Sequence, residues 1–252
     1  MTMITVQKLT KHYQAFPGAA IVKAVDGISL TIETGEFIGI MGASGSGKTT
    51  LLNMLAGIEP VTSGEITIAN TDITKLSKDK MALFRRGKLG YIFQDFNLLD
   101  SLSVKENIGL PLILDRQHPK IVEQKTRELM NYLNIARIAD NAPAQISGGQ
   151  KQRVAAARAL ITEPAVIFAD EPTGNLDSKS ANDLMLMLER LNNELANTIV
   201  LVTHDAFSAS FCKKIIFMKD GRLEMTIVSN GNHTQFFDRI LEVQSAIGGA
   251  KD

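Results

Sequence analysis

The chain has 252 residues, and its 44% hydrophobic content is enough for a sizeable core in one large domain or in a core with a lobe. Basic and acidic residues both number 27, so no overall positive charge favours nucleic acid as a partner. The single cysteine, Cys212, excludes an internal disulfide and fits a reducing compartment. With no secretory leader and no apolar run of membrane-spanning length, we expect a cytosolic protein that reaches a membrane only through a partner.

The N-terminal segments predict short strands. Residues 3–9 alternate apolar and polar side chains, and residues 21–26 and 28–32 predict two further strands separated by Gly27. Together with the apolar run 36–41, they predict a small antiparallel sheet. Tyr13 falls in an otherwise polar loop, where it either packs under the following turn or stacks on an adenine base.

Residues 42–49 match the spacing G-x-x-x-x-G-K-[ST] of a phosphate-binding loop. A buried strand is predicted before the loop, and a helix over residues 50–56 that ends at Gly57. This order aims backbone N–H groups and a positive helix end at an anion, and it disfavours a mere glycine-rich turn with an exposed lysine. Lys48 would reach the β- and γ-phosphates, and the Thr49 hydroxyl would ligate Mg²⁺. The candidate nucleotide-binding residues are Gly42, Ala43, Ser44, Gly45, Ser46, Gly47, Lys48, Thr49 and Thr50.

The middle of the chain changes character after Gln94. Residues 63–70 predict a turn and a strand, 78–86 a helix, and 89–94 a strand that ends on Gln94. From residue 96 to about 141, apolar residues recur at helical spacing, and Pro111 and Pro119 break the segment into pieces. This pattern predicts a helical lobe inserted into an α/β core.

A second potential anion-binding helix end is formed by Ser147, Gly148, Gly149 and Gln150, before a helix predicted over residues 151–161. The chain carries one lysine-bearing phosphate loop, so a second phosphate-binding segment makes sense if it completes a site on another copy of the protein. An ordinary capped helix is the alternative.

Two apolar runs end in polar side chains of catalytic type. Residues 165–171 predict a buried parallel strand that ends in Asp170 and Glu171, at the edge where α/β sites lie. Asp170 suits Mg²⁺ binding and Glu171 suits a general base that polarises water. The strand predicted over 198–203 ends at His204, for which we favour a position near the γ-phosphate over a core role. Farther on, a hairpin is predicted to turn at Asp220 and Gly221, and residues 233–252 predict an amphipathic helix.

The order of these motifs resembles that of ABC-transporter ATP-binding subunits. The motifs are residues 42–49, Gln94, 147–150, 170–171, 175–177 and His204. The resemblance covers essentially the whole chain and implies an α/β P-loop NTPase with a RecA-like core, an antiparallel β subdomain and an inserted α-helical subdomain. The implied division is residues 1–40 for the β subdomain, 41–95 and 155–230 for the core, 96–154 for the helical subdomain and 231–252 for a C-terminal helical extension.

The resemblance also implies roles for single residues. Tyr13 resembles the adenine-stacking aromatic, and Gln94 the glutamine that senses Mg²⁺ and water. Residues 147–150 resemble the signature that closes over ATP bound by the partner subunit. Asp177 resembles the loop carboxylate that crosses the dimer interface, and His204 the histidine at the γ-phosphate. The implied catalytic residues are Lys48, Gln94, Glu171 and His204, and the implied metal ligands are Thr49, Gln94 and Asp170.

The branch within the family is narrowed by two further segments. Residues 93–99 and 171–178 look like the macrolide-exporter and lipoprotein-release group, and the tail residues 233–238 and 247–249 are similar to ATPases of bacitracin-type peptide-resistance transporters. This implies an ATPase with Mg²⁺ as cofactor and ATP as substrate, acting as a homodimer on the cytoplasmic face of the membrane. The implied partners are an integral membrane permease on the helical subdomain and, through it, a sensor histidine kinase. A mechanical regulator, an ATPase of lipoprotein or macrolide handling, and a non-transport ABC ATPase are the alternatives.

Overall fold

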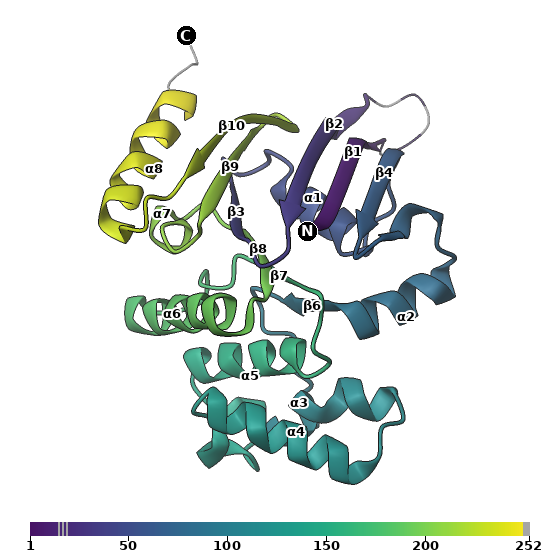
Figure 1. Ribbon diagram of the computed structural model, residues 1–252, viewed down its shortest axis with the longest axis vertical. Helices are drawn as coiled ribbons and strands as arrows, with labels where there is room; N and C mark the ends of the chain where they lie inside the picture. The colour runs from purple at the N-terminus through teal and green to yellow at the C-terminus, as the bar shows by residue number, and fades with distance from the viewer. Residues whose placement is uncertain (15, 17, 19, 249–252) are drawn as a thin grey trace.

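Two β-sheets organise residues 1–14, 16, 18 and 20–248, which are the residues that the computed structural model describes (Figure 1). The antiparallel sheet has the order β2-β1-β4-β5, and the larger sheet has the order β10-β9-β3-β8-β7-β6. The strands of the first sheet are β1 (Thr2–Tyr13), β2 (Val22–Glu33), β4 (Ser63–Ile68) and β5 (Thr71–Asp72). The strands of the second are β3 (Phe37–Met41), β6 (Leu89–Ile92), β7 (Val166–Asp170), β8 (Thr198–Val202), β9 (Lys214–Lys219) and β10 (Arg222–Val228).

The larger sheet is the centre of the molecule. Strand β3 pairs in parallel with β8 and β9, β8 with β7, and β7 with β6, whereas β10 runs antiparallel to β9. All five residues of β3 are buried, because both faces of the sheet are covered. Phe37 and Met41 face one hydrophobic cluster, and Ile38 and Ile40 face the other. A single apolar strand therefore joins two cores.

Helices cover both faces of the larger sheet, and a helical group lies at one end of the molecule. They are α1 (Lys48–Leu55), α2 (Lys78–Lys88), α3 (Val104–Leu114), α4 (Pro119–Tyr132), α5 (Gly148–Leu160), α6 (Ser178–Leu195), α7 (Ala206–Ala209) and α8 (His233–Gly248). In Figure 1, α3 and α4 lie below α5, whereas α7 and α8 lie beside β9 and β10 near the C-terminus. No helix in the described part of the chain is long and apolar enough to cross a membrane. Residues 249–252 of the predicted C-terminal extension lie outside the described residues.

Two predictions about the N-terminal strands are wrong. The run 36–41 was expected in the antiparallel sheet, but β3 lies in the larger sheet, where it pairs with β8 and β9. These partners come much later in the chain, so local sequence does not reveal the pairing. The two strands expected on either side of Gly27 are one strand, β2. Between the pairs Leu9–Ile28 and Lys11–Val25, β2 carries one extra residue, and Gly27 absorbs this bulge with a φ of +73°.

The helical predictions differ from the structure at two places, Pro111 and α6, and agree with it at Pro119. Pro111 does not break a helix but lies inside α3, where buried Ile108 and Leu112 on either side hold the helix in place. Pro119 does mark a boundary, since it is the first residue of α4. Helix α6 was not predicted at all, although its buried residues Ala181, Leu184, Met185, Leu188 and Leu191 have helical spacing.

Side-chain hydrogen bonds hold the segment between Gln94 and α3. Asn107 is fully buried, and its side-chain oxygen accepts a hydrogen bond of 2.8 Å from the Leu99 N–H. Its Nδ2 donates to the carbonyl oxygens of Leu99, Leu102 and Ser103 at 3.0 to 3.1 Å. Asn107 therefore fixes the later part of this segment, and Arg158 of α5 fixes its beginning by donating to two backbone carbonyl oxygens there.

Asn107→Leu should lower the free energy of unfolding by about 2–4 kcal/mol, because it leaves buried backbone groups without partners. Urea unfolding measures the change. Asn131→Leu on the exposed face of α4 is the control, and we expect a change within about 0.5 kcal/mol. Equal losses in the two variants would contradict the stabilising role of the Asn107 hydrogen bonds.

Candidate functional site

The loop of residues 42–49 follows β3, leads into α1 and is enclosed from two sides. A Cβ at Gly47 would overlap the carbonyl oxygen of Ala24 in β2, and one at Gly42 would overlap that of Met218 in β9. Gly47 also has a φ of +97°, which glycine adopts without strain. The backbone N–H of Gly221, in the turn after β9, donates to the carbonyl oxygen of Ser46 at 3.1 Å. The antiparallel sheet and the β9–β10 hairpin therefore form the walls of the loop.

Polar groups inside the loop fit an anionic ligand. The hydroxyl of Ser46 is buried and has no hydrogen-bond partner among the residues that the structure describes, which is costly unless a ligand supplies one. The first N–H groups of α1 have no partner within the helix, and the first turn of α1 contains no acidic residue. The Lys48 ammonium donates to the carbonyl oxygens of Gly42 and Ala43, both at 2.9 Å. Burial lowers the Lys48 pKa, and the nearby Glu171 and Asp170 oppose this effect.

The end of β7 brings Asp170 to the start of α1. The Thr49 hydroxyl donates to Asp170 Oδ1 at 3.2 Å. Burial raises the pKa of the Asp170 carboxyl, while the hydrogen bond from Thr49 opposes this shift. Within the described residues, no group of three or more His, Cys, Asp or Glu side chains could hold a metal by itself. A cation bound by Thr49 and Asp170 would therefore need oxygen ligands from a nucleotide and water.

Glu171 and His204 are in direct contact. They follow the adjacent strands β7 and β8, where Asp170 pairs with Val202. Glu171 Oε2 lies 2.8 Å from His204 Nδ1, and Glu171 has a φ of +43°, an uncommon conformation for a residue other than glycine. The side chain of His204 is 65% exposed, whereas that of Glu171 is 20% exposed. The structure thus brings together the carboxylate and imidazole that the sequence predicted on neighbouring strand ends.

Gln94 lies beside the segment that follows Glu171. A Cβ on Gly174 would lie 2.9 Å from Gln94 Nε2, so the amide packs closely against the Gly174 backbone. Asn175 Nδ2 donates to the Gln94 carbonyl oxygen at 3.2 Å and to Asp95 Oδ1 at 2.9 Å. In the described residues, Gln94 makes no hydrogen bond to Thr49 or Asp170. From sequence, Asn175 carried no predicted contact and was marked only as the first residue of the motif 175–177.

Residues 147–150 and Asp177 form a separate cluster, in which Ser147 and Asp177 are exposed and residues 148–150 are half-buried. Ser147 caps α5 through reciprocal hydrogen bonds with Gln150, at 3.3 and 2.9 Å. Gly149 packs against Ser180, and Asp177 caps α6 by accepting from the N–H and hydroxyl of Ser180 at 3.0 and 2.7 Å. The hydrogen bond from the Ser180 hydroxyl lowers the Asp177 pKa. No hydrogen bond among the described residues joins this cluster to the phosphate loop.

Tyr13 ends β1 and lies on the same sheet as the wall of the phosphate loop. The sequence predicted a strand that ends at residue 9 and a polar loop around Tyr13, but β1 continues to Tyr13, which pairs with Val22 of β2. Two residues farther along β2, Ala24 contacts Gly47. Tyr13 is 40% exposed, and the Lys11 ammonium lies 4.9 Å from the centre of its ring.

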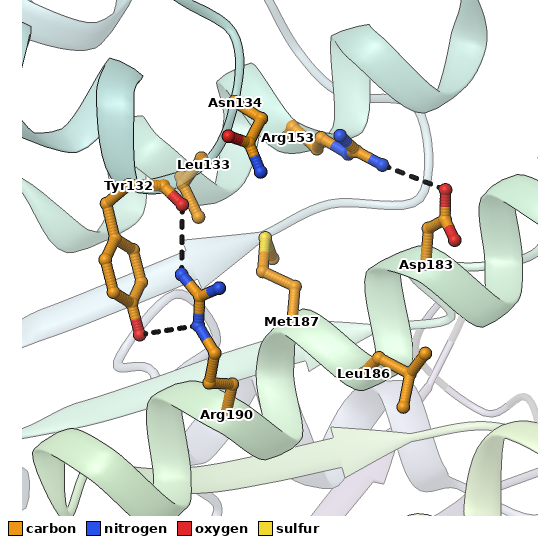
Figure 2. Close-up of a pocket in the computed structure, with 8 residues that line it drawn as sticks. All are labelled: Tyr132, Leu133, Asn134, Arg153, Asp183, Leu186, Met187 and Arg190. Carbon is orange, nitrogen blue, oxygen red and sulfur yellow. Dashed lines mark hydrogen bonds and ion pairs between the residues drawn. The ribbon is translucent and has the colours of Figure 1, made fainter.

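A shallow cavity of about 290 Å³ lies away from these groups, between the helical subdomain and α6 (Figure 2). The Arg190 guanidinium lies over the Tyr132 ring at 4.0 Å and donates to the Tyr132 carbonyl oxygen at 3.0 Å. Arg153 of α5 bonds Asp183 of α6 at 3.0 Å. Because both arginines have partners within the chain, these residues tie α4 and α5 to α6.

Residues 25–174 match the family described as ABC transporter. The chain belongs to this family. It is 48% identical to the bacitracin export ATP-binding protein BceA of Halalkalibacterium halodurans, over 91% of each chain. It is 42% identical over 91% of its length to the macrolide export ATP-binding/permease protein MacB of Hyphomonas neptunium, of which it covers 35%.

Solved structures lead to the same family. A dimeric, post-hydrolysis structure of the ATP-binding cassette MJ0796 of Methanocaldococcus jannaschii, bound to ADP and Pi, has a TM-score of 0.83 and 39% identity. The match covers 91% of this chain and all of that chain. The predicted P-loop NTPase fold and the predicted ABC ATP-binding subunit are confirmed.

Gly47→Ala should destabilise the chain by about 3 kcal/mol, because the new Cβ overlaps the Ala24 carbonyl oxygen and strains the backbone. Gly45→Ala is the matched control: its φ of +80° is also left-handed, but nothing lies within 4 Å of the new Cβ. We expect about 1 kcal/mol for this control. Urea unfolding without nucleotide compares the two variants, and equal losses would show that the β2 wall does not restrict the loop.

Proposed function

We propose that this chain hydrolyses Mg²⁺–ATP as a homodimer and thereby drives a membrane permease in bacitracin-like peptide export or resistance. One observation carries the proposal. The phosphate loop, Asp170 and the Glu171–His204 pair meet at one end of the large sheet, while residues 147–150 and Asp177 form a separate cluster with Ser147 and Asp177 exposed. If two copies share each site, one chain must carry two separate halves: a phosphate-binding half for its own nucleotide and a second half for the nucleotide of its partner.

The phosphate loop would bind the nucleotide through residues 42–50. Lys48 would exchange the carbonyl oxygens of Gly42 and Ala43 for the β- and γ-phosphates, and Ser46 would gain the partner that its hydroxyl lacks. Tyr13 would stack on the adenine from the neighbouring sheet. Thr49, Asp170 and Gln94 would hold Mg²⁺, which supplies neutralisation of charge on the phosphates.

The Glu171–His204 pair would serve the reaction with water. Glu171 would orient the attacking water and accept its proton as general base. His204 Nδ1 lies at Glu171 Oε2, so a protonated imidazole would donate from Nε2 to the γ-phosphate while Nδ1 orients the carboxylate. Gln94 would couple nucleotide binding to the position of the helical subdomain, through the segment that Asn107 holds. Positioning and charge stabilisation would supply most of the rate.

The partner subunit would complete each site with its residues 147–150 and Asp177. The dimeric state of the MJ0796 cassette supports this arrangement. The relatives named for export support a permease partner, bound by the helical subdomain at the cytoplasmic face of the membrane. BceA, named for bacitracin export, supports a peptide antibiotic as the substrate class. A sensor histidine kinase that acts through the permease is the further partner that we propose, and nucleic acid is not among the partners.

Glu171→Gln should retain ATP binding, accumulate as a dimer with ATP, and lower kcat by about 100-fold or more, because the amide cannot accept the proton of water. ATP turnover and size-exclusion chromatography with ATP measure the two effects. Glu163→Gln, near the opposite end of β7 and exposed, is the control and should keep the parent rate. A Glu171→Gln variant that turns over near the parent rate would remove Glu171 from this role.

Ser147→Arg should abolish hydrolysis and leave ATP binding by the monomer intact, because the bulky cation blocks the closing surface but not the phosphate loop. Nucleotide titration of the monomer and turnover at high protein concentration test the two statements. Gln124→Arg, which adds the same charge on α4, should behave like the parent chain. Loss of monomer binding in Ser147→Arg would mean that residues 147–150 act within their own chain.

A further inference from the structure

Helix α8 is fixed at both ends to the nucleotide-binding core. At its start, His233 Nε2 lies 2.9 Å from Glu189 of α6. At its end, the Lys219 ammonium of β9 donates to the carbonyl oxygen of Ile247 at 2.9 Å. Phe236 and Ile240 between these ends are buried. The helix is therefore an integral part of the fold and lies beside α7 and the edge of the large sheet (Figure 1).

Gln244 reaches from α8 to the turn that carries His204. Its Nε2 donates to the backbone carbonyl oxygen of His204 at 3.2 Å. Within the described residues, the hydrogen-bond partners of His204 are Gln244, at the backbone, and Glu171, at the imidazole. One α8 side chain therefore holds the backbone of the residue whose ring contacts the candidate general base.

The rest of the turn is braced on its other side. The Asp205 N–H donates to Thr203 Oγ1 at 3.0 Å, and the Asp205 carboxylate caps α7 through Ser208. The Ser208 hydroxyl in turn lies 2.8 Å from Thr173 Oγ1 in the buried interior. These contacts fix the residues that follow His204, but they leave its own carbonyl and its largely exposed ring to α8 and Glu171. Removal of the Gln244 donor would loosen His204 and leave the turn folded.

We propose that Gln244 is a positioning residue for His204, through which α8 sets the rate of ATP hydrolysis without contact to the nucleotide. The proposal rests on the role of His204 in the proposed function. Without the Gln244 donor, the backbone at His204 could rotate and direct the imidazole away from Glu171 and the γ-phosphate. The phosphate loop would be unaffected, so nucleotide binding and hydrolysis should respond differently.

The test compares full-length chains in steady-state hydrolysis of Mg²⁺–ATP. Gln244→Met keeps the length of the side chain and loses the donor, and Gln244→Lys keeps a donor. We expect Gln244→Met to lower kcat by about 5- to 20-fold with the KM for ATP within about twofold, and Gln244→Lys to recover most of the loss. Gln235→Met on the same helix is the matched control, because its side chain bonds Asn230 and not the turn.

A double-mutant cycle separates positioning from general support of the fold. In a His204→Ala background, Gln244→Met should cost no further turnover, because its effect acts through the missing imidazole. An undiminished effect in that background, an equal loss in the Met and Lys variants, or a parent kcat for Gln244→Met would overturn the proposal. If His204→Ala itself kept the parent rate, the role proposed for His204 would fail first. If His204→Ala lowered kcat and the Gln244 variants kept the parent kcat, only the role proposed for Gln244 would be overturned.

Discussion

The close enclosure of the phosphate loop is the constraint on which the other parts of the site depend. Carbonyl oxygens of β2 and β9 occupy the space that side chains at Gly47 and Gly42 would need. The loop can therefore keep its shape only between the antiparallel sheet and the β9–β10 hairpin, with β3 below it. This position places α1 beside the ends of β7 and β8, where Asp170, Glu171 and His204 follow. The residues proposed for nucleotide binding and those proposed for the chemistry are thus positioned by the same central sheet.

The second half of the proposed site is built differently. Residues 147–150 and Asp177 begin two helices, α5 and α6, and each helix is capped within its own chain. Farther along, the Arg153–Asp183 contact ties α5 to α6, and the Arg190–Tyr132 contact ties α6 to α4. The nucleotide bound by the partner subunit would therefore meet a preformed surface. This lowers the entropy cost of ordering side chains when the dimer closes. Helix α8, in turn, holds the backbone of the His204 turn through Gln244.

Local chemistry predicted much of this arrangement from sequence. The apolar run of β3, the end of α1 before Gly57 and the hairpin turn at Asp220 each depend on neighbouring residues. The sheet that contains β3 could not be predicted in the same way, because it depends on pairing with distant strands. Gly27 was interpreted as a break between two strands for a related reason. Only the pairing with β1 shows that β2 continues through the bulge. The contact from Gln244 to a backbone carbonyl leaves no sequence pattern at all.

The most direct test of the account is complementation between two inactive chains. Lys48→Ala removes the phosphate-loop function, and Ser147→Arg removes the proposed partner surface, so each variant alone should be inactive. A mixed dimer of the two contains one site with both parts intact. Equal mixing should therefore restore about a quarter of the parent ATPase activity per chain, given random twofold pairing. If each chain instead completes its own site, the mixture will be no more active than either variant alone, and the shared site will be contradicted.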